Sequence, residues 1–310
     1  MTLAGIDPRP IVETETHRYA DAAVELLERY AGQTQPFFLR LDFEGPHYPY
    51  LPPQPFASWY DPAQIHSWPN FSDPLDHKPM AQRRLLEQRG VAHLTWQDWQ
   101  VLIARYFGYM SFIDDEIGRV LRRLEELQLS NDTVILHLSD HGDMTGAHGG
   151  QFNKGPLMYD ELYHTPLIVR APGCTQPNSQ CDVLVHSFDL MPTILELAQL
   201  ALPVPVDGQS LLPLLRRERD VPLLDGIFAE YSGEEWGSFS QRMLRTHTWK
   251  YVYNPHAIDE CYNLREDPYE LHNLIDDPAY TEIIQQLRRR LREWMVETQD
   301  PLARWTSRLF

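Results

Sequence analysis

The sequence predicts an α/β protein in which a layered sheet carries helices on both faces, followed by a small carboxyl-terminal α+β subdomain. Segments of helical and of strand periodicity alternate along the chain up to residue 204. One helical segment keeps a continuous apolar face over about seven turns. After Pro203-Val204-Pro205 the pattern changes to short strands and one final helix. We therefore expect domains at residues 1–204 and 205–310.

Two helices are predicted in the first domain. The first covers residues 19–30, where apolar side chains return at the spacing of one helical stripe. The second covers residues 103–128 and presents a longer apolar face. That face consists of Ile103, Tyr106, Phe107, Met110, Ile113, Ile117, Val120, Leu121, Leu124 and Leu127. Because such a face must be buried against another element, both helices are expected to lie on the sheet.

Three short apolar runs predict the strands of that sheet, at residues 36–43, 133–139 and 166–170. Runs of this kind are typical of strands that are buried on both faces. All three are therefore expected in one buried sheet. Asp189 is expected to cap a further helix that continues through Leu200, since aspartate is favoured at the cap position.

The second domain is predicted from shorter signals. Strand-like runs cover Gly226 to Tyr231 and Met243 to Tyr253, and a helix covers Ala279 to Glu297. This helix is expected to lie on the small sheet that the strands form. In the first domain, residues 45–79 are rich in proline, tryptophan and histidine, which favours a long, ordered and irregular excursion on the surface.

Composition and charge exclude several classes of protein. Hydrophobic residues make up 43% of the 310 residues and charged residues 23%, which supports a substantial core and excludes wholesale disorder. The formal net charge of −17 argues against partners such as nucleic acid or an anionic membrane, since both attract basic surfaces. No apolar run reaches membrane-spanning length and Met1 opens no secretory signal, so a cytoplasmic location is the default expectation. The three cysteines match neither a disulfide framework nor a zinc site.

The richest stretch for chemistry runs from Ser139 to Pro156, directly after a predicted strand. Asp140 and His141 stand side by side, and a carboxylate and an imidazole in this arrangement can both reach one divalent cation. A glycine-rich loop follows and ends at Lys154, whose mobile positive charge suits a tetrahedral oxyanion. The alternative interpretation is structural: Asp140 caps a turn and His141 only packs.

A second candidate is His47, which stands between two prolines after the predicted strand at residues 36–43. A histidine stiffened in this way can donate to an anion or act as a general acid. The alternative is again a structural histidine. The tryptophans of this half of the chain either line a substrate pocket or pin down the long loop, and the residues alone favour the second role. They are Trp59, Trp68, Trp96 and Trp99.

Five motifs follow one another in the order found in a known family. They are Pro36-Phe37-Phe38 leading to Gly45-Pro46-His47-Tyr48-Pro49-Tyr50, Ser139-Asp140-His141-Gly142-Asp143 leading to Lys154-Gly155-Pro156, Thr165-Pro166-Leu167-Ile168-Val169, Asp189-Leu190-Met191-Pro192-Thr193, and the stretch from Cys261 to Leu274. Together they resemble the sulfatases, a branch of the alkaline-phosphatase-like superfamily. The resemblance implies a sulfatase-like fold that is incomplete at its amino terminus, because the chain begins at the helix that normally precedes the Pro-Phe-Phe strand.

The resemblance also implies roles for four residues. Asp140 and His141 match the family's second pair of ligands to a divalent cation, usually calcium, with magnesium or manganese in some relatives. Lys154 matches the lysine that contacts the sulfate oxygens, and His47 matches the histidine that contacts the ester group. Gly45 stands where the family commonly has an aspartate.

Two features of the family are not encoded in these 310 residues. The family has a first strand with paired aspartates, the other half of the metal site, and then a Cys-x-Pro-x-Arg or Ser-x-Pro-x-Arg motif that yields the formylglycine nucleophile. The nearest match, Cys174-Thr175-Gln176-Pro177-Asn178, has its proline one place late and lacks the arginine. We therefore expect a truncated form that is inactive by itself.

The leading hypothesis is a sulfatase, a sulfuric ester hydrolase that acts on a small-molecule sulfate ester with the help of a divalent cation. The first alternative is a phosphonate or phosphodiester hydrolase of the same superfamily, since both substrates are tetrahedral oxyanions. The second is a non-catalytic pseudoenzyme, or a subunit whose partner supplies the missing half-site. The sequence leaves the organic part of the substrate and the oligomeric state open.

Overall fold

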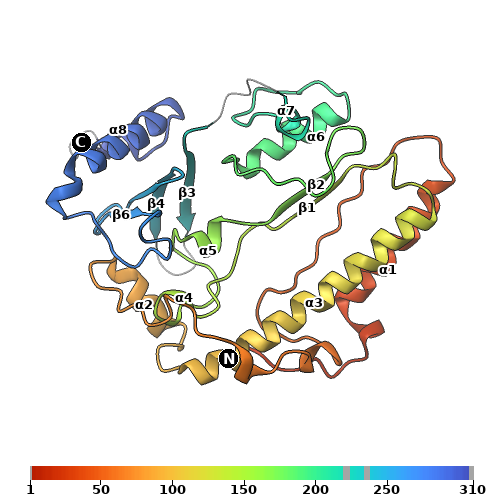
Figure 1. The fold of residues 1–310 in the computed structure, drawn as a ribbon, viewed down its shortest axis with the longest axis horizontal. Coiled ribbons are helices and arrows are strands. Elements are labelled where there is room, and N and C mark those ends of the chain that lie inside the picture. The colour runs from red at the N-terminus through yellow and green to blue at the C-terminus, as the bar shows by residue number, and fades with distance from the viewer. Residues whose placement is uncertain (1, 219–223, 234–237, 307–310) are drawn as a thin grey trace. The chain divides into compact units, whose positions relative to one another are not determined.

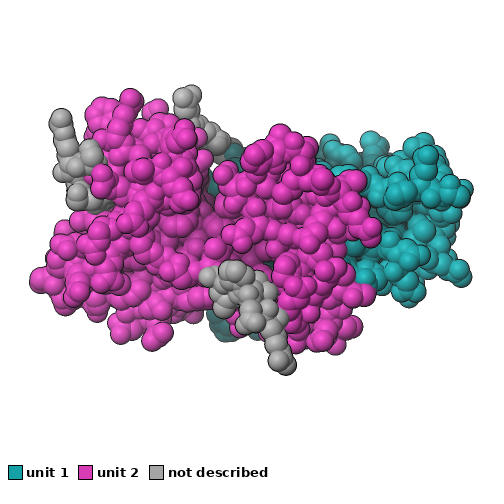
Figure 2. Space-filling view, turned by 90° about the horizontal axis from the view of Figure 1, so that it is seen from above, with its two compact units in different colours: residues 1–72, 89–154, 165–172 teal, residues 73–88, 155–164, 173–310 magenta. Residues whose placement is uncertain are grey.

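The computed structural model describes residues 2–218, 224–233 and 238–306. They divide into two compact units, coloured teal and magenta in Figure 2. Unit 1 comprises residues 1–72, 89–154 and 165–172, and unit 2 comprises residues 73–88, 155–164 and 173–310. The α/β fold class is confirmed, whereas the domain boundary at residue 205 stays a prediction. Within the described ranges, no helix has both the length and the apolar surface that crossing a bilayer requires.

Unit 1 contains two long helices that run side by side in Figure 1. They are α1, Glu15–Ala31, and α3, Trp96–Glu126. Both predicted helices are confirmed, and both begin earlier than their apolar stripes because a threonine caps the first turn. The Thr14 side chain accepts a backbone N–H of that turn in α1, and Thr95 forms a reciprocal capping box with Asp98 in α3.

An ionic cluster ties α1 to α3. The Glu116 side chain of α3 is buried, and its Oε1 lies 2.7 Å from His17 Nδ1 of α1. Arg119 forms an ion pair with Glu116 and reaches across to Asp21 of α1, with 2.5 Å between Nη2 and Oδ1. Because a buried carboxylate is stable only with such partners, the cluster fixes how the two helices lie against each other.

The sheet described in unit 1 is a pair of antiparallel strands. They are β1, Ile135–Leu138, and β2, Leu167–Arg170. The strands predicted at 133–139 and 166–170 are confirmed, but the prediction that they are buried is wrong. Leu138 is 46% exposed and Ile168 is 64% exposed. Apolar composition identified the strands correctly, but it carries no information about which layers cover them.

The prediction of a strand at residues 36–43 is also wrong. This segment belongs to no sheet of the described residues, and its side chains alternate between exposed and half-buried. Phe38 is 74% exposed, whereas Phe37 stacks on Tyr30 of α1 with 5.0 Å between the ring centroids. A strand requires a neighbour to hydrogen-bond with, and no described strand pairs with this segment, so the apolar pattern alone did not make it one.

Unit 2 is built on an antiparallel sheet with the order β3-β4-β5-β6 among its described residues. The strands are β3, Ile227–Gly233; β4, Phe239–Arg245; β5, Trp249–Tyr253; and β6, Glu260–Asn263. Helix α8, Thr281–Glu297, packs on the sheet through Leu287 and Leu291, which meet Leu244 and Tyr251 in one core. The predicted small sheet and its covering helix are thus confirmed, while β6 was not predicted.

Two details of unit 2 correct the predictions. The run Met243–Tyr253 is not one strand but belongs to β4 and β5, because Thr246 Oγ1 accepts two following backbone N–H groups and turns the chain. Helix α6, Leu190–Leu197, ends before Leu200. Asp189 precedes it without capping it by a side-chain bond, since its carboxylate accepts two backbone N–H groups outside α6.

The remaining helices are short. They are α2, Met80–Gln88; α4, Ala147–Gly150; α5, Asp160–Tyr163; α7, Leu212–Leu215; and α9, Ala303–Thr306. Single 3-10 turns occur at Ile11–Glu13, Phe56–Ser58, Pro62–Gln64, Ser187–Asp189 and Pro278–Tyr280. Two of these turns lie in the excursion at residues 45–79, which otherwise has no regular structure, as predicted.

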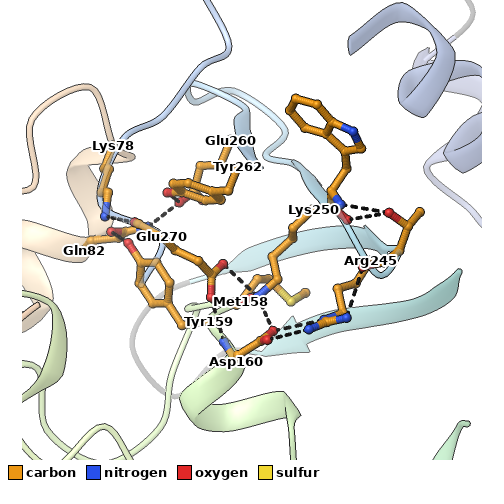
Figure 3. Close-up of polar contacts among 12 residues, drawn as sticks. Lys78, Gln82, Met158, Tyr159, Asp160, Arg245, Lys250, Glu260, Tyr262 and Glu270 are labelled. Carbon is orange, nitrogen blue, oxygen red and sulfur yellow. Dashed lines mark hydrogen bonds and ion pairs between the residues drawn. The ribbon is translucent and has the colours of Figure 1, made fainter. Parts of the chain in front are cut away.

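A buried ionic network joins β4 and β5 to two other segments of unit 2 (Figure 3). Lys250 is fully buried on β5, and its Nζ lies 2.6 Å from Asp160 Oδ1 and 2.7 Å from Glu270 Oε1. Arg245 of β4 adds a second cation, with its Nη2 2.9 Å from Asp160 Oδ2. Burial alone would raise the pKa of Asp160, but the two cations lower it below its usual range. The network therefore fastens residues 155–164 to the sheet.

Replacing Lys250 by alanine should lower the free energy of unfolding by about 3–5 kcal/mol, because it leaves the buried Glu270 carboxylate without its cation and Asp160 with Arg245 alone. The measurement is urea unfolding followed by circular dichroism. The control is Arg290→Ala, which removes an ion pair to a carboxylate that is 84% exposed and should cost at most about 1 kcal/mol. Equal losses in the two variants would contradict a stabilising role of the network.

Candidate functional site

The structure brings together all four residues that the sequence singled out, and all four belong to unit 1. Lys154 Nζ lies 2.7 Å from His141 Nε2, and Asp140 Oδ2 lies 3.6 Å from the same nitrogen. The rings of His47 and His141 meet edge to face with 6.4 Å between their centroids. We refer to His47, Asp140, His141 and Lys154 as the site cluster. It forms although more than a hundred residues separate His47 from Lys154 in the sequence.

The hydrogen bonds of His141 define its tautomer. Its Nδ1 lies 2.8 Å from the carbonyl oxygen of Gly142, and a carbonyl can only accept, so Nδ1 carries the proton. The Nε2 atom of the neutral ring then has a free lone pair, which accepts from the Lys154 ammonium. A neutral imidazole with an available Nε2 lone pair is also the form that binds metal ions.

His47 has the same arrangement. Its Nδ1 lies 2.9 Å from the carbonyl oxygen of Tyr48, and its ring stacks on the Tyr48 ring with 4.8 Å between centroids. The Nε2 edge is therefore the one left for other partners. Two residues before His47 the chain is closely packed: a Cβ at Gly45 would lie 2.6 Å from the Tyr109 ring and 2.8 Å from Ile113. A side chain at position 45, such as aspartate, would require Tyr109 and Ile113 to shift.

The glycine-rich loop between Asp140 and Lys154 is packed into unit 1. Gly146 has a φ of 92°, and a Cβ there would lie 2.9 Å from the ring of Trp99, which is fully buried. Trp68 donates from its Nε1 to the Thr145 carbonyl oxygen at 2.9 Å. These two tryptophans hold the loop in place, and Trp59 is 57% exposed. Both observations favour the role of fixing a loop over that of lining a substrate pocket.

Two further residues join the neighbourhood without having been predicted to do so. Tyr50 is fully buried, and its hydroxyl donates to Asp143 Oδ2 at 2.9 Å. Burial raises the pKa of the Asp143 carboxyl above its usual value, although three hydrogen bonds to it favour the charged form. Both residues lie inside motifs quoted above. A single sequence does not reveal that their side chains form hydrogen bonds inside the protein.

The donor set fits a divalent cation only in part. Asp140 and His141 offer a carboxylate and an imidazole 3.6 Å apart, a spacing that two neighbouring ligands of one ion can adopt. The Asp140 side chain is 85% exposed, and its Oδ1 accepts the backbone N–H of His141 at 2.9 Å. Among the described residues, however, no group of three or more histidine, cysteine or acidic side chains is arranged to hold a metal ion. The site cluster therefore offers two side chains to a cation, fewer than the coordination shell of a hard cation takes.

Comparison with known families agrees with the motif order. The family model for sulfatases matches residues 5–200, and a second model, for the carboxyl-terminal region of N-sulphoglucosamine sulphohydrolase, matches residues 146–297. The chain belongs to the sulfatase family. Both models include Lys154, and the first includes the whole site cluster.

Individual sulfatases align with most of this chain. It is 31% identical to the sulfatase YidJ of Escherichia coli (strain K12), over 95% of this chain and 58% of the relative. It is 29% identical to an arylsulfatase of Clostridium perfringens (strain 13 / Type A), over 89% of this chain and 56% of the relative. A phosphonate monoester hydrolase from Silicibacter pomeroyi has a similar structure, with a TM-score of 0.84, 26% identity and coverage of 96% of this chain and 65% of that one. The chain thus spans less than two thirds of the length of each.

Nuclear magnetic resonance should show His47 and His141 as Nδ1–H tautomers at about pH 9, above the ordinary histidine pKa of ~6.5. Free histidine favours the other tautomer, so this result follows only if the backbone carbonyls of Tyr48 and Gly142 hold the rings as described. The measurement is a long-range nitrogen–proton correlation of the imidazole rings, assigned by single His→Gln variants. Finding protons on Nε2 would contradict the described ring orientations.

Proposed function

We propose that the site cluster binds and hydrolyses a sulfate ester, with a divalent cation as cofactor, as part of a sulfatase-type hydrolase. The observation that supports this most is the approach of the Lys154 ammonium to the His141 imidazole, with the His47 ring against His141, within a sulfatase-family chain. A tetrahedral oxyanion is stabilised by cationic and N–H donors that converge from different segments. His47 comes from one stretch, and His141 and Lys154 come from the two ends of another, so the three residues meet that requirement.

Lys154 is the cation best suited to the anion. The chain has three lysines, and the other two, Lys78 and Lys250, are buried in ion pairs with carboxylates. Within the described ranges, no ion pair joins Lys154 to a carboxylate, and its hydrogen-bond partner is the His141 ring. Its charge is therefore available for sulfate oxygens, in a protein whose net charge of −17 otherwise repels anions.

His47 is suited to the leaving group. Its Nδ1–H is engaged with the Tyr48 carbonyl, so a protonated ring directs its second N–H outward from Nε2. That N–H can donate to the ester oxygen as charge develops on it. Asp140 and His141 would hold the divalent cation, calcium first and magnesium or manganese as alternatives, and the cation would supply charge neutralisation at the sulfate group.

The nucleophile is not among these 310 residues in its family form, since no Cys-x-Pro-x-Arg or Ser-x-Pro-x-Arg motif occurs in them. We infer that the described chain binds sulfate but does not turn over sulfate esters by itself. Small-molecule sulfate esters are the substrate class that the family suggests. The names of the relatives point to different substrates, so they do not identify the organic part of the ester. The cytoplasmic location suggested by the composition stays a prediction.

A phosphonate ester is the second candidate substrate. The solved structure with a TM-score of 0.84 is a phosphonate monoester hydrolase, and its 26% identity is close to that of the curated sulfatases. A lysine and an imidazole donor serve either tetrahedral anion, because both groups bind oxygen atoms rather than the central atom. Relative rates on an aryl sulfate and an aryl phosphonate, measured with a form of the protein that carries the family's nucleophile, distinguish the two.

The purified 310-residue chain should not hydrolyse an aryl sulfate above the buffer rate, with calcium, magnesium or manganese added in turn. Covalent catalysis needs an activated nucleophile within reach, and two protein ligands hold a hard cation only weakly. The measurement is release of the phenol over hours at saturating ester. Turnover that disappears in Asp140→Ala would show that another residue replaces the family's nucleophile.

Inorganic sulfate should bind the same chain, and Lys154→Ala should raise its Kd about tenfold, the usual effect of losing one charge-assisted hydrogen bond. Titration calorimetry measures the change. Arg40→Ala is the matched control: it removes the same charge from unit 1, but Arg40 is 76% exposed and pairs only with its neighbour Asp42 among the described contacts. Equal effects of the two substitutions would mean that net charge, rather than the site cluster, attracts sulfate.

A further inference from the structure

The Asp143 carboxylate lies at the centre of a set of hydrogen bonds that neither the motif nor the proposed chemistry explains. Its Oδ1 accepts the backbone N–H of Thr145 at 3.0 Å and that of Asn153 at 3.1 Å. Its Oδ2 accepts the hydroxyl of Tyr50 at 2.9 Å. The three donors come from the start of the glycine-rich loop, from its end, and from the segment that contains His47. One side chain therefore touches every stretch that contributes to the site cluster.

The two bonds to Oδ1 close the loop at its base. Asn153 directly precedes Lys154, so a bond to its N–H fixes the backbone from which the lysine side chain departs. Two backbone bonds support the same closure: Met144 N–H donates to the Asn153 carbonyl at 3.2 Å, and Gly146 N–H to the Gln151 carbonyl at 2.8 Å. Asn153 has a φ of 56°, a left-handed conformation that needs such support to persist.

The bond to Oδ2 connects the loop to the other half of the cluster. Tyr50 is fully buried, and its ring lies against Tyr106 of α3 and Phe152 of the loop, with centroids 5.0 Å and 5.8 Å away. Its own backbone is also held, since its N–H donates to the carbonyl of Leu3 at 2.9 Å. Because Tyr50 follows His47 by three residues, this contact limits how far the His47 segment can move from the loop.

We propose that Asp143 is a positioning residue that sets the separations among His47, His141 and Lys154 by accepting these three hydrogen bonds. Among the described contacts, the Asp143 side chain touches no member of the site cluster. Asp143 therefore acts on their positions through the backbone. The inference rests on the proposed function, because that function gives the site cluster its role. The hydrogen bonds of Asp143 do not depend on which anion binds.

The chemistry of the three bonds predicts a distinctive order among substitutions. An asparagine keeps an oxygen that accepts the two backbone N–H groups, and its amide donates to the Tyr50 hydroxyl, which can accept instead. Asp143→Asn should therefore keep the geometry, whereas Asp143→Ala removes all three bonds. Tyr50→Phe removes only the bond to the His47 segment. A residue that acted through its charge would give a different result, because the asparagine substitution would then be as damaging as the alanine substitution.

The experiment is nuclear magnetic resonance of the full chain with carbon-13-labelled histidine, with the ring signals of His47 and His141 assigned by His→Gln variants. At fixed pH, Asp143→Ala should shift both signals, Tyr50→Phe should shift His47 alone, and Asp143→Asn should leave both near their wild-type positions. Addition of inorganic sulfate should show a Kd raised about tenfold in Asp143→Ala, as small displacements of binding groups commonly do.

Asp189→Ala is the matched control, because Asp189 also accepts two backbone N–H groups, those of His186 and Gln209, but in unit 2. It should lower stability without moving either histidine signal. Unmoved signals in a folded Asp143→Ala chain would overturn the proposal, as would an asparagine variant as perturbed as the alanine one. If Asp143→Ala does not fold, an unmoved His47 signal in Tyr50→Phe overturns it. If sulfate leaves the wild-type signals unchanged, the proposed function fails while the signal positions still test Asp143.

Discussion

The requirement that backbone N–H groups find acceptors shapes the glycine-rich loop, and the rest of the site depends on how that loop is closed. Gly146, His148 and Asn153 all have positive φ values, which bend the chain tightly and turn N–H groups inward. Asp143 accepts two such groups and so stabilises a conformation that is unfavourable by itself. Lys154 leaves the loop at its closed end, opposite His141, because of this geometry.

The same use of acidic side chains recurs in unit 2. Asp189 accepts two backbone N–H groups, and Asp160 and Glu270 surround the buried ammonium of Lys250. A chain with a net charge of −17 thus places part of its excess of carboxylates inside, where they organise loops and neutralise cations. Lys154 differs from the other two lysines in facing neutral imidazole instead of a carboxylate. That contrast is a physical reason to assign it to an external anion.

The proposed site offers more groups to an anion than to a cation. A lysine and two histidines can neutralise negative charge and donate N–H groups, whereas Asp140 and His141 fill a minority of the positions that calcium prefers. This chain spans 58% of the length of YidJ and 65% of the phosphonate hydrolase. We propose that the described residues contribute the anion-binding groups of a sulfatase-type site.

The sequence by itself determined the elements that depend on local periodicity and on motif order. The stripes at 19–30 and 103–128 became α1 and α3, and the final helix became α8, because an amphipathic helix carries its own hydrogen bonds and needs only one packed face. The four residues of the site cluster were found because an acid, two histidines and a lysine occur in a collinear set of motifs.

Only the tertiary structure decided what depends on a partner distant in sequence. Residues 36–43 have a strand's composition, but no described strand pairs with them, and no pattern within eight residues can reveal that. The exposure of β1 and β2 and the break between β4 and β5 have the same origin. Asp143 and Tyr50 escaped prediction because their importance lies in bonds between segments ninety-three positions apart, which exist only once the chain has folded.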